Sequence, residues 1–218
     1  MRSSQSSIQS LKTTVAPASE PVSLTDLKTW LRIDWTDDDA WLSMLIQDAR
    51  QWVESHTSRA LITQTLQGVW TLPKSPESKL RGLYAQLGME LTFNLPRSTP
   101  GNITVTTAEI EKDLDVWQTM VLTNDYVVDA DNDPPRVWLR ASAISYWAPT
   151  GALLNFMGVY APRVRITWQA GYGSDYSSVP ASFRRAIMNA AAYLYEHRAD
   201  GSPPPDSLLS GLDAVRNV

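Results

Sequence analysis

The segment from Val179 to Ala199 constrains the fold most, because its helical pattern is apolar on more than one side. Ser178 can cap this helix, and Pro180 suits its first turn. One row at helical spacing consists of Phe183, Ile187, Ala190, Ala191 and Leu194. A second row follows Arg184 and consists of Met188, Ala192 and Tyr195. Such a helix is buried on several sides, either deep in one core or between its own domain and a neighbouring subunit.

The composition excludes several classes of function. The 218 residues are 43% hydrophobic, enough for one domain or one domain with an insertion. A net charge of −4 argues against a general nucleic-acid binder. The absence of cysteine excludes disulfides, thiolate metal sites and cysteine nucleophiles. No apolar run approaches the roughly 20 residues of a membrane span, and the N-terminus lacks the compact apolar segment of a secretory signal.

The N-terminal part predicts a flexible arm followed by two helices. Residues 1–20 are rich in Ser and Thr and contain little to bury, which is typical of a flexible arm. Ser23 and Asp26 resemble a capping box and predict a helix over residues 24–32. Thr36 can cap a second helix over residues 37–57, whose first turn holds three aspartates that favour capping over metal binding. The buried stripe of that helix is expected to contain Trp41, Leu45, Ala49, Trp52 and His56, widened by Leu42, Ile46 and Val53.

Residues 60–172 predict a β block. Apolar and polar side chains alternate in short runs that turn signals separate, which indicates an antiparallel sheet or a small barrel. The runs cover residues 62–72, 89–95, 103–105, 114–122, 126–128, 136–139 and 164–168. The fifth and sixth runs flank the turn-rich sequence DADNDPP and predict a hairpin.

The order of these elements predicts an α+β fold. Two N-terminal helices and the closing helix over residues 180–199 form a small helical bundle, and an antiparallel β block is inserted between them. We expect residues 21–200 to form one domain with two layers. Residues 1–20 and 201–218 lie outside it.

Residues 201–218 predict a docking tail. Gly201 and the prolines at 203–205 end the closing helix. An apolar edge at helical spacing follows and consists of Leu208, Leu209, Leu212 and Val215. A helix this short is marginal in water by itself, so we expect it to order only against a partner surface or a neighbouring subunit. The alternative is a frayed tail.

The sequence contains no recognisable catalytic constellation. His56 continues an apolar helix face, and His197 lies near a helix end, so neither predicts a catalytic role. Asp129, Asp131 and Asp133 have the spacing of a calcium loop, but the glycine and the final glutamate of such a loop are absent, which favours a polar turn. We expect no enzyme activity, cofactor or metal.

An aromatic set leaves one binding alternative open. A sugar- or base-stacking platform could use Trp117, Trp138, Tyr146, Trp147, Tyr160, Tyr172 and Tyr176. The chain would then be a carbohydrate-binding module. The same residues more often fill a core or a subunit interface. A hydrolase with carboxylates that cannot be paired from the sequence is a third alternative.

Three segments together resemble the head–tail connector (adaptor) proteins of long-tailed phages and gene transfer agents. The segment PVSLTDLKTWLRIDWTDDDAWLSMLIQDARQWVESHTSRALITQT resembles their amino-terminal part. YVVDADNDPPRVWL resembles their central hairpin, and VRITWQAGYGSDYSSVPASFRRAIMNAAAYLYEHR resembles their end. The likeness covers roughly residues 21–200 and is weaker between Pro73 and Trp117.

The resemblance implies a structural virion protein. It implies a homo-oligomeric ring, a dodecamer in the virion, which lies in the neck beneath the portal and is made in the host cytoplasm. The ring would extend the DNA channel without specific DNA binding and would carry the stopper or the tail. We expect a subunit interface at Arg184, Arg185, Met188 and Tyr195, with an acidic partner such as Asp48 or Glu54 on the next subunit.

Overall fold

The computed structural model describes residues 8–72, 91–113, 115–140, 143, 163–199 and 201–212, which form two compact units. Each unit combines separate parts of the chain. The sheet unit consists of Met1–Val15, Thr65–Leu95 and Pro100–Gln169. The helical unit consists of Ala16–Gln64, Pro96–Thr99 and Ala170–Val218. The single domain over residues 21–200 therefore stays a prediction.

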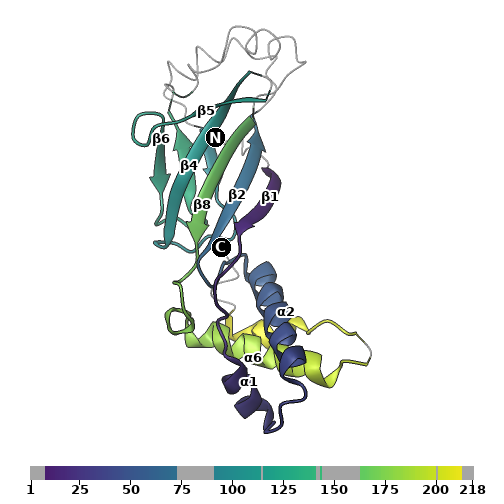
Figure 1. Ribbon diagram of the computed structural model, residues 1–218. Coiled ribbons are helices and arrows are strands. Elements are labelled where there is room, and N and C mark those ends of the chain that lie inside the picture. Colours follow the sequence, from purple (N-terminus) through teal and green to yellow (C-terminus); the bar gives the residue numbers. More distant parts are fainter. Residues whose placement is uncertain are drawn as a thin grey trace. The chain divides into compact units, whose positions relative to one another are not determined.

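The helical unit contains the predicted bundle. Its helices are α1 (Leu24–Leu31), α2 (Asp39–Thr57) and α6 (Ala181–Glu196), and they are labelled in Figure 1. Two 3-10 helices, η1 (Tyr176–Ser178) and η2 (Asp206–Leu212), precede and follow α6. The capping prediction for α1 is confirmed, because the hydroxyl of Ser23 accepts the Asp26 N–H at 3.0 Å.

Two other capping predictions are wrong. Asp38, not Thr36, is the N-cap residue of α2, and its carboxylate makes no cap hydrogen bond. That carboxylate instead accepts hydrogen bonds from Trp35 and Tyr195. Pro180, not Ser178, precedes α6, because Ser178 belongs to η1.

The packing of α2 against α6 forms the centre of the helical core. Leu42, Leu45 and Ala49 are buried on α2 at helical spacing. They belong to one core cluster with the row of α6 that the sequence predicts, which includes Phe183 and Ile187. The predicted stripe of α2 is wrong at Trp41, whose side chain is 41% exposed because the buried face is centred on its neighbour Leu42.

The sheet unit contains two sheets. The larger has the strand order β1 (Ile8–Val15), β2 (Gln64–Thr71), β8 (Arg163–Ala170), β4 (Ile103–Asp113), β5 (Val116–Thr119), and these strands lie side by side in Figure 1. The smaller has the order β3 (Leu91–Asn94), β7 (Arg136–Leu139), β6 (Tyr126–Asp129). The predicted hairpin is confirmed, because β6 and β7 pair antiparallel.

Aromatic side chains connect the two sheets. The ring of Trp70 on β2 meets the ring of Phe93 on β3 edge to face, with centroids 5.6 Å apart. Trp168 on β8 lies 6.1 Å from Trp70, also between ring centroids. All three side chains are fully buried, so the core of this unit lies where the inner faces of its sheets meet.

The prediction of a flexible arm is wrong for residues 8–15. This segment forms β1 and pairs antiparallel with β2, with Leu11 opposite Gly68. The strand is held by backbone hydrogen bonds at an edge of the sheet, and all its residues except Leu11 are exposed. Since neither face of β1 is buried, its sequence has no apolar alternation by which a strand could be recognised. Residues 1–7 lie outside the described residues.

The Gly-Tyr-Gly segment after β8 is attached to the segment after α2. The N–H of Tyr172 donates to the carbonyl of Leu61 at 3.0 Å, and the N–H of Thr63 donates to the carbonyl of Gly173 at 2.9 Å. Gly171 has a φ of +140°, and a Cβ there would lie 2.5 Å from the backbone nitrogen of Thr63. Only glycine allows this approach. The aromatic ring of Tyr172 then packs against Phe183 of α6.

We predict that Leu45→Ala destabilises the helical unit by about 2–5 kcal/mol, because it leaves a cavity between α2 and α6. Met44→Ala is the matched control, since Met44 is the preceding residue and is 55% exposed. Urea unfolding of both variants measures the difference. Equal midpoints for the two variants would contradict the observed packing of α2.

Candidate interaction site on the helical unit

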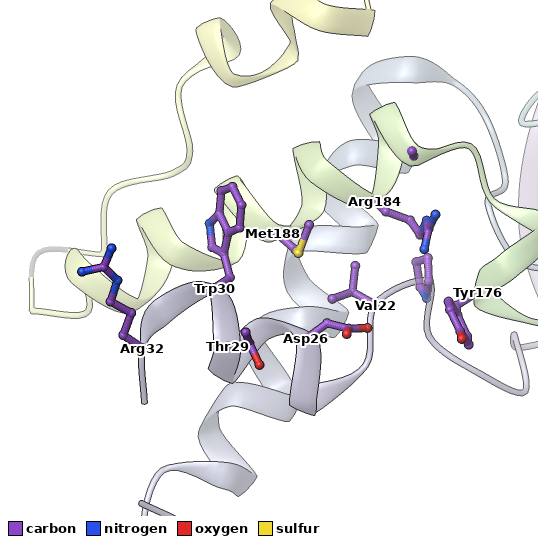
Figure 2. Close-up of a pocket in the computed structure, with 10 residues that line it drawn as sticks. Val22, Asp26, Thr29, Trp30, Arg32, Tyr176, Arg184 and Met188 are labelled. Atoms are coloured by element: carbon purple, nitrogen blue, oxygen red, sulfur yellow. The ribbon is translucent and has the colours of Figure 1, made fainter. Parts of the chain in front are cut away.

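An open pocket of about 700 Å³ lies between α1 and α6 within the helical unit. Trp30 of α1 and Met188 of α6 line its middle, Arg32 lies at one end, and Arg184 and Tyr176 lie at the other (Figure 2). Trp30 and Tyr176 are each 50% exposed. Aromatic residues, Met and Arg are enriched at protein interfaces, so this pocket is the candidate interaction site.

Arg184 is one of the charged residues that line the pocket, together with Arg32 and Asp26. Its guanidinium carbon lies 5.8 Å from the ring centroid of Tyr176. Its Nε is buried and has no hydrogen-bond partner within the described part of the chain. Asp26 also lines the pocket, but its carboxylate accepts the hydroxyl of Ser23 at 2.7 Å. The cation therefore lacks a carboxylate partner among the described residues.

The structure separates the four residues predicted for a subunit interface. Arg184 and Met188 line the pocket. Arg185 is exposed and lies next to Gly211 of η2, on another side of α6. Tyr195 donates a hydrogen bond to Asp38 at 2.9 Å and packs against the helical core. The pocket thus combines two of the four predicted residues with Trp30 and Tyr176.

Asp38 connects the turn before α2 to the end of α6. Its Oδ2 accepts the indole N–H of Trp35 at 3.1 Å and the hydroxyl of Tyr195 at 2.9 Å. The pKa of Asp38 is lowered, first by the hydrogen bond from Trp35 and then by that from Tyr195. Its neighbour Asp39 pairs with Lys28 of α1 at 2.6 Å. Asp38 and Asp39, two of the three consecutive aspartates at the start of α2, therefore stabilise the contacts between the helices.

The predicted acidic partner Glu54 is excluded, because its carboxylate is buried inside the helical unit. It accepts hydrogen bonds from Arg50, from the N–H of Leu61 and from the side chain of Gln64. Its side chain is only 2% exposed. Asp48, the other predicted partner, is exposed on α2.

The prediction that the tail orders only against a partner is wrong for η2. Leu209 and Leu212 are 1% and 2% exposed and belong to the helical core. Leu208 is half-buried, and Val215 lies outside the described residues. The segment has an apolar edge because α6 exposes a complementary surface to it within the same chain. Docking of Leu209 and Leu212 on the portal is therefore not available to the folded chain.

Both histidines have structural partners. The Nδ1 of His56 lies 2.8 Å from the carbonyl of Trp52, and its Nε2 lies 3.4 Å from Asp206. His197 stacks on Tyr193 with ring centroids 3.9 Å apart. Ser55 Oγ lies 3.3 Å from the Nδ1 of His56, but this hydroxyl donates to the carbonyl of Trp52 at 2.8 Å.

The sheet unit holds a dense ion-pair cluster around Arg163. Its guanidinium binds Glu111 and Asp115, with Nη2 at 2.5 Å and 2.6 Å from their carboxylate oxygens. Trp117 lies beside Arg163 and Arg165, whose guanidinium carbons are 5.4 Å and 4.2 Å from its ring centroid. The hydrogen bond to Glu111 contributes most to the raised pKa of Arg163. Each charge has a partner, so the cluster fixes β4, β5 and β8 together.

The other residue groups that the sequence analysis considered are the three aspartates of the calcium-like spacing and the aromatic set. Asp129 accepts a hydrogen bond from Asn132 within the β6–β7 turn. Across the described residues, no cluster of three potential metal ligands occurs. No described helix has the length and hydropathy needed to cross a membrane. Of the aromatic set, Tyr172 packs in the helical core and Trp117 in the arginine cluster, while Tyr146, Trp147 and Tyr160 lie outside the described residues.

The sequence reasoning missed Trp30 as a site residue. Trp30 lies at the edge of the α1 stripe that consists of Leu24, Leu27 and Leu31, and its side chain is exposed. The available signal in the sequence was a tryptophan at the edge of an otherwise aliphatic helix stripe. Its use required knowing that α1 and α6 are neighbours.

Comparison with known proteins finds a family model that matches part of the chain and solved structures that share its fold. Residues 21–91 match the model of the phage gp6-like head-tail connector proteins. A chain of the "Neck of empty GTA particle computed with C6 symmetry" has a TM-score of 0.67 and 21% identity, with 96% of each chain covered. A chain of the "Virion of native gene transfer agent (GTA) particle" has a TM-score of 0.67 and 20% identity over 95% of each chain.

A further chain, from the "Neck of native GTA particle computed with C12 symmetry", has a TM-score of 0.65 and 19% identity over 96% of each chain. No curated protein sequence matches the chain. These matches confirm the predicted resemblance, and they show that the α+β fold extends over nearly the whole chain.

We predict that Leu209→Ala lowers the free energy of unfolding by about 2–5 kcal/mol, because Leu209 is buried against the helical core. Leu208→Ala is the matched control and should cost much less, since Leu208 is only half-buried. Thermal unfolding of the isolated protein measures both. Identical melting temperatures for the two variants would mean that η2 is a frayed tail and is not packed on the helical core.

We predict that Tyr195→Phe destabilises the protein at neutral pH and not in acid. The folded pKa of Asp38 lies below its ordinary value of 3.8, so its hydrogen bonds stabilise the fold above that value and are lost as the pH falls through the folded pKa. The difference in stability between Tyr195→Phe and the wild type should therefore disappear below that range. Tyr193→Phe is the control, and a difference that stays constant with pH would contradict the role of Asp38.

Proposed function

We propose that this chain is a structural protein of the neck of a phage-like particle. In this proposal it is a head–tail adaptor, which forms a ring under the portal, extends the DNA channel and provides the platform for the stopper or the tail. The observation that carries the proposal is the match of the fold to neck chains over 96% of both partners. The connector family model on residues 21–91 supports it independently of the three-dimensional comparison.

A ring is favoured by the surface of the helical unit. The neck structures with similar chains were computed with C6 and C12 symmetry. A chain that uses one face to bind another face of the next copy forms a ring when the rotation between copies closes. The exposed pocket of Trp30, Tyr176, Met188 and Arg184 has the composition of such a face. We therefore assign the pocket to the contact between subunits.

The charge of the chain suits a passive channel. The net charge is −4, and an acidic wall does not retain DNA by phosphate contacts. The ring would let DNA pass without specific binding. The protein would act through assembly and not through catalysis.

We predict that particles made without this gene stop before the tail is attached. Deletion should leave heads and free tails in the lysate, and a copy of the gene in trans should restore tailed particles. Electron microscopy counts the particles, and immunoblotting for the portal controls for intact heads. Tailed particles at normal yield from the deletion strain would refute the proposed function.

A further inference from the structure

We propose that the α1–α6 pocket binds the outer face of α2 from a second copy of this chain, with Arg184 paired to Asp48. This inference rests on the proposed ring and specifies its contact. The pocket supplies an unpaired cation and exposed aromatic surface. The outer face of α2 supplies an unpaired carboxylate and exposed apolar surface.

The outer face of α2 consists of Trp41, Met44 and Asp48, which follow one another at helical spacing. Trp41 is 41% and Met44 is 55% exposed, although both are large and apolar. Asp48 is exposed and has no ion pair among the residues that the structure describes. Solvated helix faces are normally polar, so this face has the composition of a contact surface.

The pocket complements that face in chemistry. Trp30, Tyr176 and Met188 provide apolar surface, and Arg184 provides a guanidinium whose buried Nε has no partner in the described chain. The Nε itself is shielded from solvent, but the half-buried guanidinium has no carboxylate partner in the described part of the chain, so a carboxylate of a second copy can pair with it. Arg also forms planar paired hydrogen bonds with carboxylates, which fix the orientation of the partner.

The two surfaces belong to different parts of the helical unit and share no residue. The buried face of α2 points to α6, and its outer face is therefore directed away from that contact. A contact between two different surfaces of identical chains is heterologous, and it generates a closed ring or an open helix instead of a two-fold dimer. A different neck protein, such as the portal, is the competing occupant of the pocket.

Cysteine pairs test the contact directly, because the wild-type chain contains no cysteine. Particles are assembled with the variant Met44→Cys/Met188→Cys and treated with a short bis-maleimide reagent. We expect a ladder of covalent oligomers of this chain on a denaturing gel. Particles assembled from a mixture of the two single variants should stop at dimers, because each chain then carries one thiol.

Three outcomes of this experiment are distinguishable. A double variant that is present in purified particles but remains monomeric on the gel overturns the contact and leaves the proposed function intact. A product that mass spectrometry identifies as a conjugate with another neck protein assigns the pocket to that protein and also overturns the contact. Absence of the wild-type chain from purified necks refutes the proposed function itself.

Charge exchange provides a second test with matched controls. Arg184→Glu and Asp48→Arg each place like charges opposite each other, and we expect each to reduce the yield of tailed particles by about tenfold or more. The combination should recover most of the yield. Arg185→Glu and Gln47→Arg change neighbouring exposed positions and should have little effect. Normal yields from both single variants, with the monomers folded by circular dichroism, would overturn the pairing.

Discussion

The helical unit depends on the contact between α2 and α6, two helices that strands β2 to β8 separate in the sequence. Burial of Leu45, Ala49, Phe183 and Ile187 at this contact provides the hydrophobic stabilisation that brings the two ends of the chain together. The entropic cost of closing a loop rises only slowly with its length. A long β insertion is therefore compatible with a small bundle. The pocket between α1 and α6 exists only because this contact places α6 beside the N-terminal helices.

A buried carboxylate sets the path of the chain out of α2. Glu54 is almost completely buried, so its charge must be compensated by hydrogen bonds and by a cation. Arg50 supplies the cation and also binds Glu20, while Leu61 and Gln64 supply further donors. The same network holds the segment before α1, the end of α2 and the beginning of β2. Glu54 is thus unsuitable as an interface residue, and Asp48 remains as the exposed acid of α2.

The sequence predicted those elements that have a periodic pattern and missed those that have none. The stripes of α1, α2 and α6 and the β6–β7 hairpin follow from spacing and turn residues alone. Strand β1 was missed because it buries neither face. It forms by pairing with the exposed edge of β2, and such tertiary pairing leaves no pattern in the local sequence. The apolar edge of η2 was recognised, but a single sequence cannot tell whether Leu209 packs on its own chain or on another. Trp41 was misplaced because a shift of the buried face by one residue leaves the spacing unchanged.

The second apolar row of α6 has two different surroundings along its length. At its C-terminal end, Tyr195 is covered by the turn before α2 through its hydrogen bond to Asp38. Further toward its N-terminal end, Met188 and Arg184 line the open pocket (Figure 2). The row is therefore covered by the chain itself at one end and open at the other, which is the part that the proposed contact would cover.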